Sequence, residues 1–462
     1  MKIKKYLKNC TAVYHTTLDP KSQGVIRMHL VPPKKLKPGI PWVVIINGYS
    51  VLPLQTSWAV ILKEFIEELN LTEGKEFTNE ELDKFIQKCV NNVAKIFKNT
   101  DKKIIKSDMK SLIDTIKSVA LGKKPAEEIG YMTLSKYAKF MSAPHRMDLM
   151  ISSMEKNGCW NCNQKCLHCY AANEVKSAVA ELNTEEWKKV IDGCREAHIP
   201  SLTFTGGEPT IREDLVELIG YAKWFVTRLN TNGIKLTKKL CSELYEASLD
   251  SVQVTLYSYD ENIHNTLVGG NHFKETVEGI KNAINAGLDV SINTPLCSVN
   301  NEYINTMKFA KELGVKYFSC SGLIPTGNAK LDASEITSLS KNEILEVVKS
   351  ASMYAVQNDL ELAFTSPGWI DAVELNKLKL VVPSCGACLS NMAIAPNGDV
   401  IPCQSWLNGI SLGNMLKEKF KTIWDNENCK KIRTKAIHKE EVCLLKVNIS
   451  WMSRRRLDWR LI

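Results

Sequence analysis

The stretch that decides the fold begins with MDLMISS (147–153), an apolar run of strand length, and continues into CNQKCLHC (162–169). A helical stretch, NTEEWKKVIDGCREA (183–197), separates it from a second strand-like run, SLTFTGG (201–207), which opens a TGGEP turn. Strand, loop, helix and strand in this order predict a βαβ unit with two parallel strands. Both motifs follow the carboxyl end of a strand, which is where α/β folds usually carry their functional residues.

The alternation of strands and helices continues downstream of this unit. Apolar strands separated by helices of this length predict a parallel sheet of about six βα units, closed into part of a barrel. We therefore predict an α/β fold with a partial (β/α)6 barrel over residues 146–370. The further strand candidates are WFVTRLNTN (224–232), SVQVTLYS (251–258), DVSINTPL (289–296) and KYFSCSGLI (316–324).

Two segments of different composition flank the predicted barrel. Residues 1–145 contain three strand-like runs followed by helical patterns, among them TNEELDKFIQKCVNNVAKIF (78–97) with a Thr78–Glu81 capping box, and predict a small α+β domain. Residues 371–462 contain cysteines at 385, 388, 403, 429 and 443 and predict a cysteine-rich auxiliary domain. Cys10 and Cys89, in contrast, have no neighbours at metal-ligand spacing and predict ordinary buried thiols.

Composition narrows the class of protein. The chain has 462 residues, 15 of them cysteine, and neither an apolar run long enough to cross a membrane nor a signal-peptide pattern in MKIKKYLKNC. These features exclude a secreted disulfide scaffold and predict reduced thiols in the cytoplasm. The charge is uneven: residues 1–145 hold 24 Lys and Arg against 14 Asp and Glu, a net +10, and the remainder is near neutral. Two alternatives explain this excess of positive charge: a Lys-rich surface without a specific role, or a site for an acidic partner.

The C-x3-C-x2-C run indicates a metal centre. Three thiolates on one loop can bind three irons of a cubane [4Fe–4S] cluster, which leaves the fourth iron for a substrate or cofactor. Structural zinc is the alternative, with Cys159 or His168 as the fourth ligand. Glu208, in the TGGEP turn, adds a carboxylate that could bind a cation, although a plain glycine turn explains GGE alone.

CNQKCLHCY followed by TGGEPT resembles the radical S-adenosylmethionine (SAM) superfamily over about residues 146–330. The resemblance implies that Cys162, Cys166 and Cys169 hold a [4Fe–4S] cluster and that SAM binds its free iron. It also implies cleavage of SAM to a 5′-deoxyadenosyl radical that abstracts hydrogen from the substrate. The resemblance further implies that Gly206, Gly207 and Glu208 contact the SAM amino group. His168 would lie near the adenine, and Ser258 and Asn293 near the ribose. Asn328 stands where the family often has Arg.

CGACLSNMAIAPNGDVIPC (385–403) resembles the start of the auxiliary-cluster domain called SPASM, or its shorter Twitch form. Its C-x9-G-x4-C spacing fits Cys388, Gly398 and Cys403. The tail KVNISWMSRRRLDWRLI lacks the further cysteines of full SPASM domains and looks foreign to them, so the prediction is one auxiliary iron–sulfur cluster. The candidate ligands are Cys385, Cys388, Cys403 and Cys443, with Cys429 as a further candidate.

The three predicted domains together resemble maturases of ribosomally made peptides. That resemblance implies a precursor peptide whose leader adds as a strand to a sheet edge in residues 1–145, and the net +10 favours an acidic leader. It also implies thioether or other cross-link formation, with flavodoxin or ferredoxin as electron donor. A sulfatase-maturing or cofactor-biosynthesis radical enzyme is one alternative. A non-catalytic metal protein that binds nucleic acid is another, although no nucleic-acid motif accompanies the basic segments.

Overall fold

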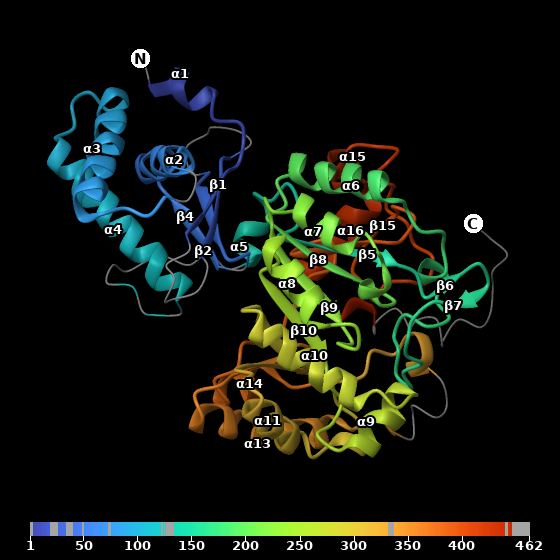
Figure 1. The fold of residues 1–462 in the computed structure, drawn as a ribbon. Helices are drawn as coiled ribbons and strands as arrows, with labels where there is room; N and C mark the ends of the chain where they lie inside the picture. The colour runs from blue at the N-terminus through green and yellow to red at the C-terminus, as the bar shows by residue number, and fades with distance from the viewer. Residues whose placement is uncertain are drawn as a thin grey trace. The chain divides into compact units, whose positions relative to one another are not determined.

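The computed structural model describes residues 3–18, 26–33, 40–48, 50–72, 75–121, 123, 125, 134–330, 337–438 and 442–445. The chain divides into two compact units, Met1–His145 and Arg146–Ile462 (Figure 1). The tail after residue 445, which the sequence marks as foreign to a SPASM domain, lies outside the described residues. Within the described part of the chain, no helix combines the length and the apolar character needed to cross a bilayer.

The first unit is built on an antiparallel sheet in which each strand pairs with the next. Its strands are β1 (Tyr14–Leu18), β2 (Ile26–Val31), β3 (Trp42–Ile46) and β4 (Ser50–Leu54). The fourth strand was not predicted because it contains Pro53, which lacks an N–H and is tolerated in sheets mainly on edge strands. The helices are α1 (Ile3–Lys8), α2 (Thr56–Asn70), α3 (Asn79–Ile96), α4 (Lys102–Ala120) and α5 (Leu134–Ala138).

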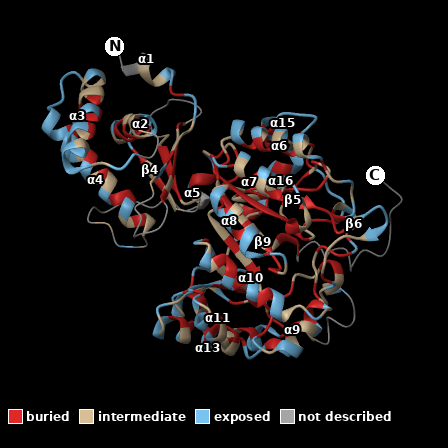
Figure 2. Cartoon of the chain, viewed as in Figure 1, coloured by how far each residue is buried: buried red, intermediate tan, exposed pale blue. Residues whose placement is uncertain are grey.

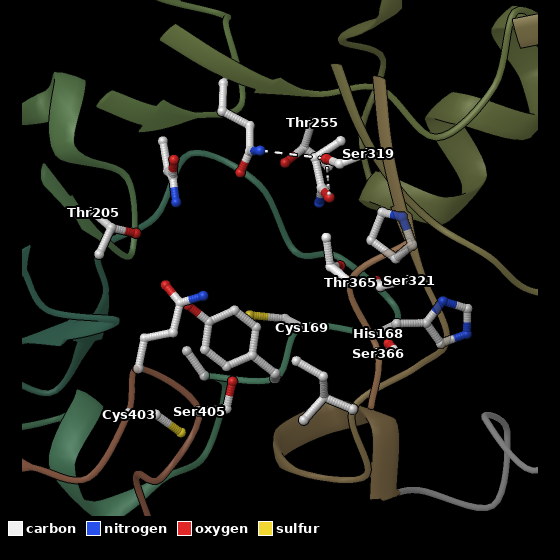
Figure 3. Close-up of a pocket in the computed structure, with 18 of the residues that line it drawn as sticks. His168, Cys169, Thr205, Thr255, Ser319, Ser321, Thr365, Ser366, Cys403 and Ser405 are labelled. Atoms are coloured by element: carbon white, nitrogen blue, oxygen red, sulfur yellow. Dashed lines mark hydrogen bonds between the residues drawn. The ribbon is translucent and has the colours of Figure 1, made fainter. Parts of the chain in front are cut away.

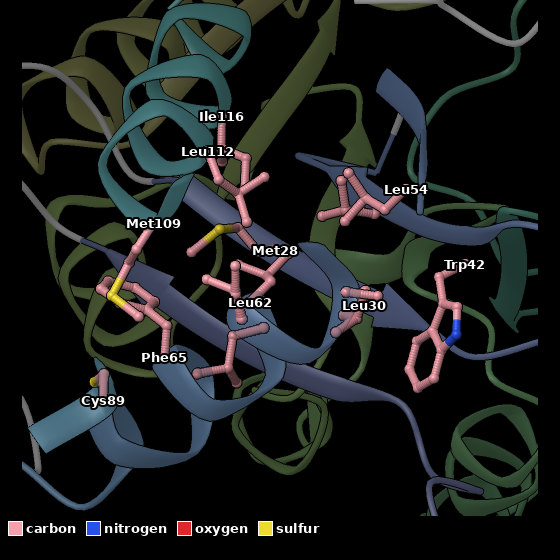
Figure 4. Close-up of a cluster of buried hydrophobic side chains, with 14 of the residues drawn as sticks. Met28, Leu30, Trp42, Leu54, Leu62, Phe65, Cys89, Met109, Leu112 and Ile116 are labelled. Atoms are coloured by element: carbon pink, nitrogen blue, oxygen red, sulfur yellow. The ribbon is translucent and has the colours of Figure 1, made fainter. Parts of the chain in front are cut away.

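An apolar core joins this sheet to helices α2, α3 and α4. Figure 4 shows Met28 and Leu30 of the sheet close to Leu62 and Phe65 of α2. Helix α3 begins at the predicted capping box, since the Thr78 hydroxyl accepts from the Glu81 N–H and the Glu81 carboxylate accepts from the Thr78 N–H. Cys10 and Cys89 are both buried in this core.

The second unit contains a nine-stranded sheet in the order β13-β12-β11-β10-β9-β8-β5-β14-β15. All neighbouring pairs are parallel except β14–β15, which confirms the predicted α/β class. The strands are β5 (Arg146–Ser152), β8 (Ser201–Gly206), β9 (Val226–Thr231), β10 (Ser251–Thr255), β11 (Asp289–Pro295), β12 (Tyr317–Ser321), β13 (Glu361–Phe364), β14 (Asn391–Ile394) and β15 (Val400–Ile401).

Helices connect the parallel strands and turn their apolar faces to the sheet, as the buried and exposed stripes in Figure 2 show. They are α6 (Thr184–Glu196), α7 (Leu215–Tyr221), α8 (Lys238–Glu246), α9 (Glu261–Val268), α10 (Phe273–Asn285), α11 (Tyr303–Glu312) and α13 (Lys341–Gln357). A hairpin of β6 (Glu155–Lys156) and β7 (Cys159–Trp160) precedes the cysteine loop. The cysteine-rich segment adds α14 (Ala372–Lys377), α15 (Phe420–Asp425) and α16 (Glu427–His438).

The cysteine-rich segment shares the sheet of the barrel. Its strand β14 pairs in parallel with β5, with Asn391 opposite Arg146, and the Arg146 N–H donates to the Ser390 carbonyl at 3.0 Å. Residues 146–370 and 371–462 therefore belong to one compact unit here, although their compositions differ.

Alternation along the strands leaves polar side chains inside the barrel. In β9, Leu229 is buried on the helix-facing side, whereas Arg228 and Asn230 line an internal cavity. In β10, Gln253 and Thr255 line the same cavity. Because successive side chains of a strand point to opposite faces, these sequences combine an apolar outer face with a polar lumen. The lumen can therefore bind a polar ligand.

Candidate functional site

A cavity of about 510 Å³ occupies the inside of the barrel. Its walls come from strands β8 to β12, from the loop that carries CNQKCLHC, and from the cysteine-rich segment. Figure 3 shows Thr205, Thr255 and Ser319 of the strands around this space, with Cys169 and Cys403 contributed by the other two walls. The volume lies within the range of ordinary small-molecule and cofactor sites.

The loop places Cys162, Cys166 and Cys169 together on the cavity wall. Backbone bonds hold the loop, since Lys165 N–H donates to Val268 O at 3.0 Å and Leu167 N–H donates to Leu267 O at 2.9 Å at the end of α9. The Cys162 thiol approaches the Gly207 carbonyl at 3.6 Å.

The electrostatics of these thiols fit an iron cluster. Burial raises the pKa of Cys162 to about 12 and raises the pKa of Cys166 well above its ordinary value. Cysteine ligands bind metal as thiolates, so the three need a strong local positive charge, which a cluster of iron ions supplies. Among the described residues, no three His, Cys, Asp or Glu side chains form a group compact enough for a single metal ion. A zinc ion needs its ligands within about 2.0–2.3 Å of one centre, and the described residues contain no such group.

A second segment clamps the cysteine loop from outside. In η4 (Gly327–Lys330), the Asn328 N–H donates to the Cys169 carbonyl at 2.9 Å, and its amide Nδ2 donates to the Cys166 carbonyl at 3.1 Å. The Thr326 hydroxyl donates to the Tyr170 carbonyl at 3.1 Å. Gly327 has φ +58°, and a Cβ there would lie 2.4 Å from the Cys169 carbonyl oxygen. Asn328, where the family often has Arg, thus contacts the backbone of the cysteine loop.

A close backbone contact at Gly206 and the hydrogen bonds of Glu208 fix the conformation of the TGGEP turn. Gly206 has φ +142°, and a Cβ there would lie 2.3 Å from the Ser152 carbonyl oxygen, so only glycine fits between β5 and β8. Glu208 is 1% exposed and accepts hydrogen bonds from the N–H and hydroxyl of Thr210, the hydroxyl of Thr231 and the N–H of Asn232. Burial raises the pKa of Glu208, and these four donors oppose the shift. Its carboxylate therefore fixes the ends of β8 and β9, and it lies on the cavity wall beside Cys162.

The structure places the predicted adenine and ribose contacts, His168, Asn293 and Ser258, in different surroundings. His168 lines the cavity, is 6% exposed, and its Nε2 lies 2.8 Å from the Thr337 hydroxyl, while burial lowers its pKa. Asn293 also lines the cavity, where its Oδ1 accepts from Ser319 at 2.9 Å. Ser258 is buried but does not line the cavity; its hydroxyl accepts from the Asp260 N–H at the start of α9.

The C-terminal cysteines separate into two groups. Cys385, Cys403 and Cys443 line the cavity. Cys388 is fully buried, does not line the cavity, and shares a side-chain hydrogen bond with Cys429. Of the four candidate auxiliary ligands, the structure therefore brings three together at the cavity and turns Cys388 toward Cys429.

Several cavity residues were missed from the sequence. Tyr170 follows the cysteine run, and burial raises its pKa. The Gln253 amide of β10 donates to the Ser319 hydroxyl of β12 at 3.3 Å, past the intervening strand β11. Arg146 and Arg228 also line the cavity. The sequence does carry a signal for these residues, because polar side chains alternate with apolar ones along the strands. This alternation identifies inward-facing residues only when it is known which face of the sheet surrounds the cavity.

Comparison with known proteins gives matches to both motif regions. Residues 161–310 match the radical SAM superfamily, and residues 385–445 match SPASM, an iron–sulfur cluster-binding domain. Two curated relatives are AdoMet-dependent heme synthases. The one from Oleidesulfovibrio alaskensis is 32% identical over 190 residues, covering 40% of this chain and 49% of that protein. The one from Methanosarcina barkeri is 28% identical over 285 residues, covering 57% and 79%. The chain thus spans about half the length of the first relative.

The fold is similar to that of Streptococcus suis SuiB. Its crystal structure with the precursor peptide SuiA has a TM-score of 0.62 and 16% sequence identity, and the match covers 94% of this chain and 97% of that one. Another structure of SuiB, bound to S-adenosylmethionine, has a TM-score of 0.61. At 16% sequence identity, the similarity to SuiB shows a shared fold and nothing further.

The family matches agree with the geometry of the cavity. The C-x3-C-x2-C loop and the TGGEP turn meet inside a parallel barrel, and cysteines of the second matched region line the same space. The cofactors of such a protein are a [4Fe–4S] cluster and S-adenosylmethionine, with auxiliary iron–sulfur binding in the SPASM domain. The chain therefore carries a radical SAM domain over residues 161–310 and a SPASM domain over residues 385–445.

Proposed function

We propose that this enzyme modifies a ribosomally made peptide by hydrogen abstraction, with a thioether or another cross-link as the product. The observation that carries the proposal is the shared cavity, which brings Cys162, Cys166 and Cys169 into one polar chamber with Cys385, Cys403 and Cys443. The first three cysteines would hold the cluster that binds SAM, and the second three would contribute ligands to one auxiliary cluster. When bound, the cluster and SAM supply 5′-deoxyadenosyl radical chemistry, with flavodoxin or ferredoxin as electron donor.

The chain's own residues would orient the cofactor and exclude water. Gly206 and Gly207 allow a ligand to approach the backbone at the end of β8, and Glu208 fixes that edge through its four hydrogen bonds. The Nδ1 of His168 is buried and has no hydrogen-bond partner within the described part of the chain, so it is available to a bound adenine or ribose. Asn293 offers an amide on the opposite wall.

The first unit supports a peptide substrate. Its four-stranded antiparallel sheet ends in β1 and β4, and an extended leader could add to such an edge through main-chain hydrogen bonds. We favour β1 because Pro53 of β4 has no N–H to offer. The net +10 of residues 1–145 would attract an acidic leader. SuiB, which shares the fold over nearly the whole chain, binds a precursor peptide.

A second candidate is a reaction of cofactor biosynthesis. The names of the two curated relatives, both AdoMet-dependent heme synthases, favour it. The two candidates require the same radical chemistry and differ in the substrate, so one assay format can separate them.

The test uses the full chain, reconstituted anaerobically with iron and sulfide and reduced with dithionite. SAM is added with either a short Cys-containing peptide encoded beside the gene or a carboxylated tetrapyrrole, and the yield of 5′-deoxyadenosine and the substrate mass are measured. We expect 5′-deoxyadenosine to form, to be lost in Cys166→Ala, and the peptide alone to change mass. A peptide of unchanged mass beside a modified tetrapyrrole would move the assignment to the second candidate. No nucleoside from the fully loaded protein would reject both.

A further inference from the structure

Two arginines inside the barrel, Arg146 and Arg228, face the cavity. Arg146 begins β5, and Arg228 is the third residue of β9; both line the cavity. In the strand register, Asp148 of β5 lies opposite Thr203 of β8, and Thr203 lies opposite Arg228. Residues in register on neighbouring strands point to the same face, so Asp148, Thr203 and Arg228 form one row across the sheet.

The charges in this row do not balance. The single carboxylate is Asp148, which is 1% exposed, and its Oδ1 lies 3.0 Å from Nε of Arg146. Within the described residues, Arg228 forms no ion pair, and its only hydrogen bond is a long one, from Nε to the Ser251 hydroxyl at 3.5 Å. Two guanidinium groups therefore share the one carboxylate of this row, which leaves one net positive charge in the row.

An unbalanced charge in this position is costly without a ligand. Burial lowers the pKa of Arg228, the nearby Arg146 lowers it further, and Asp148 opposes the shift. Because a guanidinium stays protonated in proteins, the cost remains until an anion arrives. Arg228 has five N–H donors in a planar fork and uses one of them here, so the rest can bind a carboxylate in a bidentate manner.

The neighbouring polar atoms also lack partners. The hydroxyl of Thr203 and the Oδ1 of Asn230 are buried and have no hydrogen-bond partner among the described residues, and both residues line the cavity with Arg228. A buried polar atom without a partner normally marks a place that water or a ligand fills. Two neighbouring strands, β8 and β9, thus present a cation and two unpaired polar groups to the same part of the lumen.

We propose that Arg228, assisted by Arg146, binds a carboxylate group of the substrate inside the barrel. The inference rests on the proposed function, because it makes the lumen the place where the substrate is held. The carboxylate could belong to an acidic side chain of a peptide or to a small carboxylic acid, and both present the same group to the arginine.

The test measures binding of small probes to the full, iron-reconstituted chain without SAM. The probes are glutamate and glutamine, each acetylated at nitrogen and methylamidated at the carboxyl end, together with glutarate, and binding is followed by ligand-observed NMR. We expect the glutamate probe to bind about 10-fold more tightly than the glutamine probe, since a charged hydrogen bond adds at least that factor. Arg228→Gln should remove this preference, and Arg228→Lys should keep part of it. Arg195→Gln, the same change on the exposed face of α6, should leave it intact.

A variant that should strengthen binding distinguishes a loss of the binding site from a folding defect. Asp148→Asn removes the competing carboxylate, so it should strengthen the preference for the glutamate probe while Arg228→Gln abolishes it. Equal binding of the two capped probes by the wild-type chain, or weaker glutamate binding by Asp148→Asn, would overturn the proposal. Tighter binding of the capped glutamate than of glutarate identifies a peptide side chain as the source, and the reverse order identifies a small acid. Because no SAM is present, this result is independent of nucleoside formation by the wild-type enzyme.

The auxiliary cysteines provide the remaining control. Burial raises the pKa of Cys403 and the Asp148 carboxylate adds to that shift, so the charged row lies near the cavity wall that carries the auxiliary cysteines. Iron per chain and the iron–sulfur absorption of Arg228→Gln should match those of the wild-type chain. A loss of iron together with an unchanged probe preference would assign Arg228 to the charge balance of the auxiliary centre and reject the substrate role.

Discussion

Gly206 is a residue at which one added methyl group should be strongly destabilising. A Cβ at this position would lie 2.3 Å from the Ser152 carbonyl oxygen and 2.8 Å from its nitrogen, and backbone atoms of a central strand cannot move aside. We expect Gly206→Ala to lower the free energy of unfolding by about 3 kcal/mol and to abolish SAM binding. Denaturant unfolding and equilibrium dialysis with SAM would measure the two effects.

Gly158 supplies the matched control for this substitution. It also has a positive φ, +75°, but an added Cβ would meet nothing within 4 Å. Gly158→Ala should therefore cost only the left-handed backbone penalty, about 1 kcal/mol, and leave SAM binding unchanged. Equal losses for the two variants would mean that backbone conformation, and not the contact with Ser152, decides the effect.

The cluster ligands Cys162, Cys166 and Cys169 could be predicted from the sequence because they lie close together on one loop. The C-terminal cysteines could not be sorted in this way, since Cys385 and Cys388 are only three residues apart and both fit a plausible spacing. The structure separates them through the backbone: Cys388 has φ +54°, and its side chain meets Cys429 instead of the cavity. Spacing alone carries no information about such a reversal of direction.

At the scale of elements, η4 holds the cysteine loop through Asn328. Its Nδ2 donates to the Cys166 carbonyl, and an aspartate there would present a carboxylate oxygen to that carbonyl. We expect Asn328→Asp to shorten the lifetime of the cluster in air by about tenfold, as the loss of one buried hydrogen bond implies. Decay of the iron–sulfur absorption after exposure to air would measure it.

The control for this prediction is Asn173, an exposed residue that donates to the Oδ1 of Asn328 from the other side. Asn173→Ala removes a surface hydrogen bond but leaves both contacts to the cysteine loop. Its cluster should decay at nearly the wild-type rate. If Asn328→Asp decays no faster than Asn173→Ala, the clamp has no part in protecting the cluster.

Helix α9 carries a pH-sensitive residue. His264 is fully buried. Its Nδ1 accepts from the Tyr257 N–H at 3.4 Å, and its Nε2 has no hydrogen-bond partner among the residues that the structure describes. Burial lowers the pKa of His264 to about 4, and the nearby His272 adds to the shift. The unfolded chain, with a pKa near 6.5, binds this proton more strongly, so its contribution to stability is present above pH 6.5 and is lost as the pH falls toward 4.

We therefore expect the iron-free chain to lose about 2 kcal/mol of stability between pH 7 and pH 5 through this one group. His264→Asn keeps an acceptor for the Tyr257 N–H but cannot take up the proton. Urea unfolding of both proteins at the two pH values would show a smaller pH dependence in the variant. An equal pH dependence would assign the titration to another group.

The elements themselves were predictable to different degrees. The barrel strands from 147 to 324 were found because each has an apolar run bounded by turns and helices. Strand β13 was missed because ELAF (361–364) is short, with exposed Glu361 and Ala363, and follows α13 after only a short turn. That β14 joins the barrel sheet was also not predicted, since strand neighbours far apart in the chain leave no local signal.

At the scale of the whole molecule, the first unit has a core of its own. Its buried cluster extends from Cys10 to Val119 and, within the described residues, includes none from the second unit. We expect a fragment of residues 1–145 to fold and to unfold cooperatively. Thermal unfolding followed by circular dichroism would measure this.

Two alanine variants make that prediction specific. Leu62 is fully buried, so Leu62→Ala should destabilise the fragment by about 2–5 kcal/mol. Ile104 is 55% exposed, and Ile104→Ala should change the stability by less than about 1 kcal/mol. A fragment that melts without a cooperative transition would show that the first unit needs the rest of the chain.

The pairing of β14 with β5 also sets the order of events during synthesis. Arg146 leaves the ribosome long before its neighbour Asn391, which is 245 positions further along the chain. At about 5–20 residues per second, the first barrel strand waits roughly 10–50 s for its second neighbour. During that interval one edge of β5, directly upstream of the cysteine loop, remains uncovered. Iron–sulfur assembly proteins therefore have a period in which to deliver a cluster before the C-terminal segment closes over the sheet.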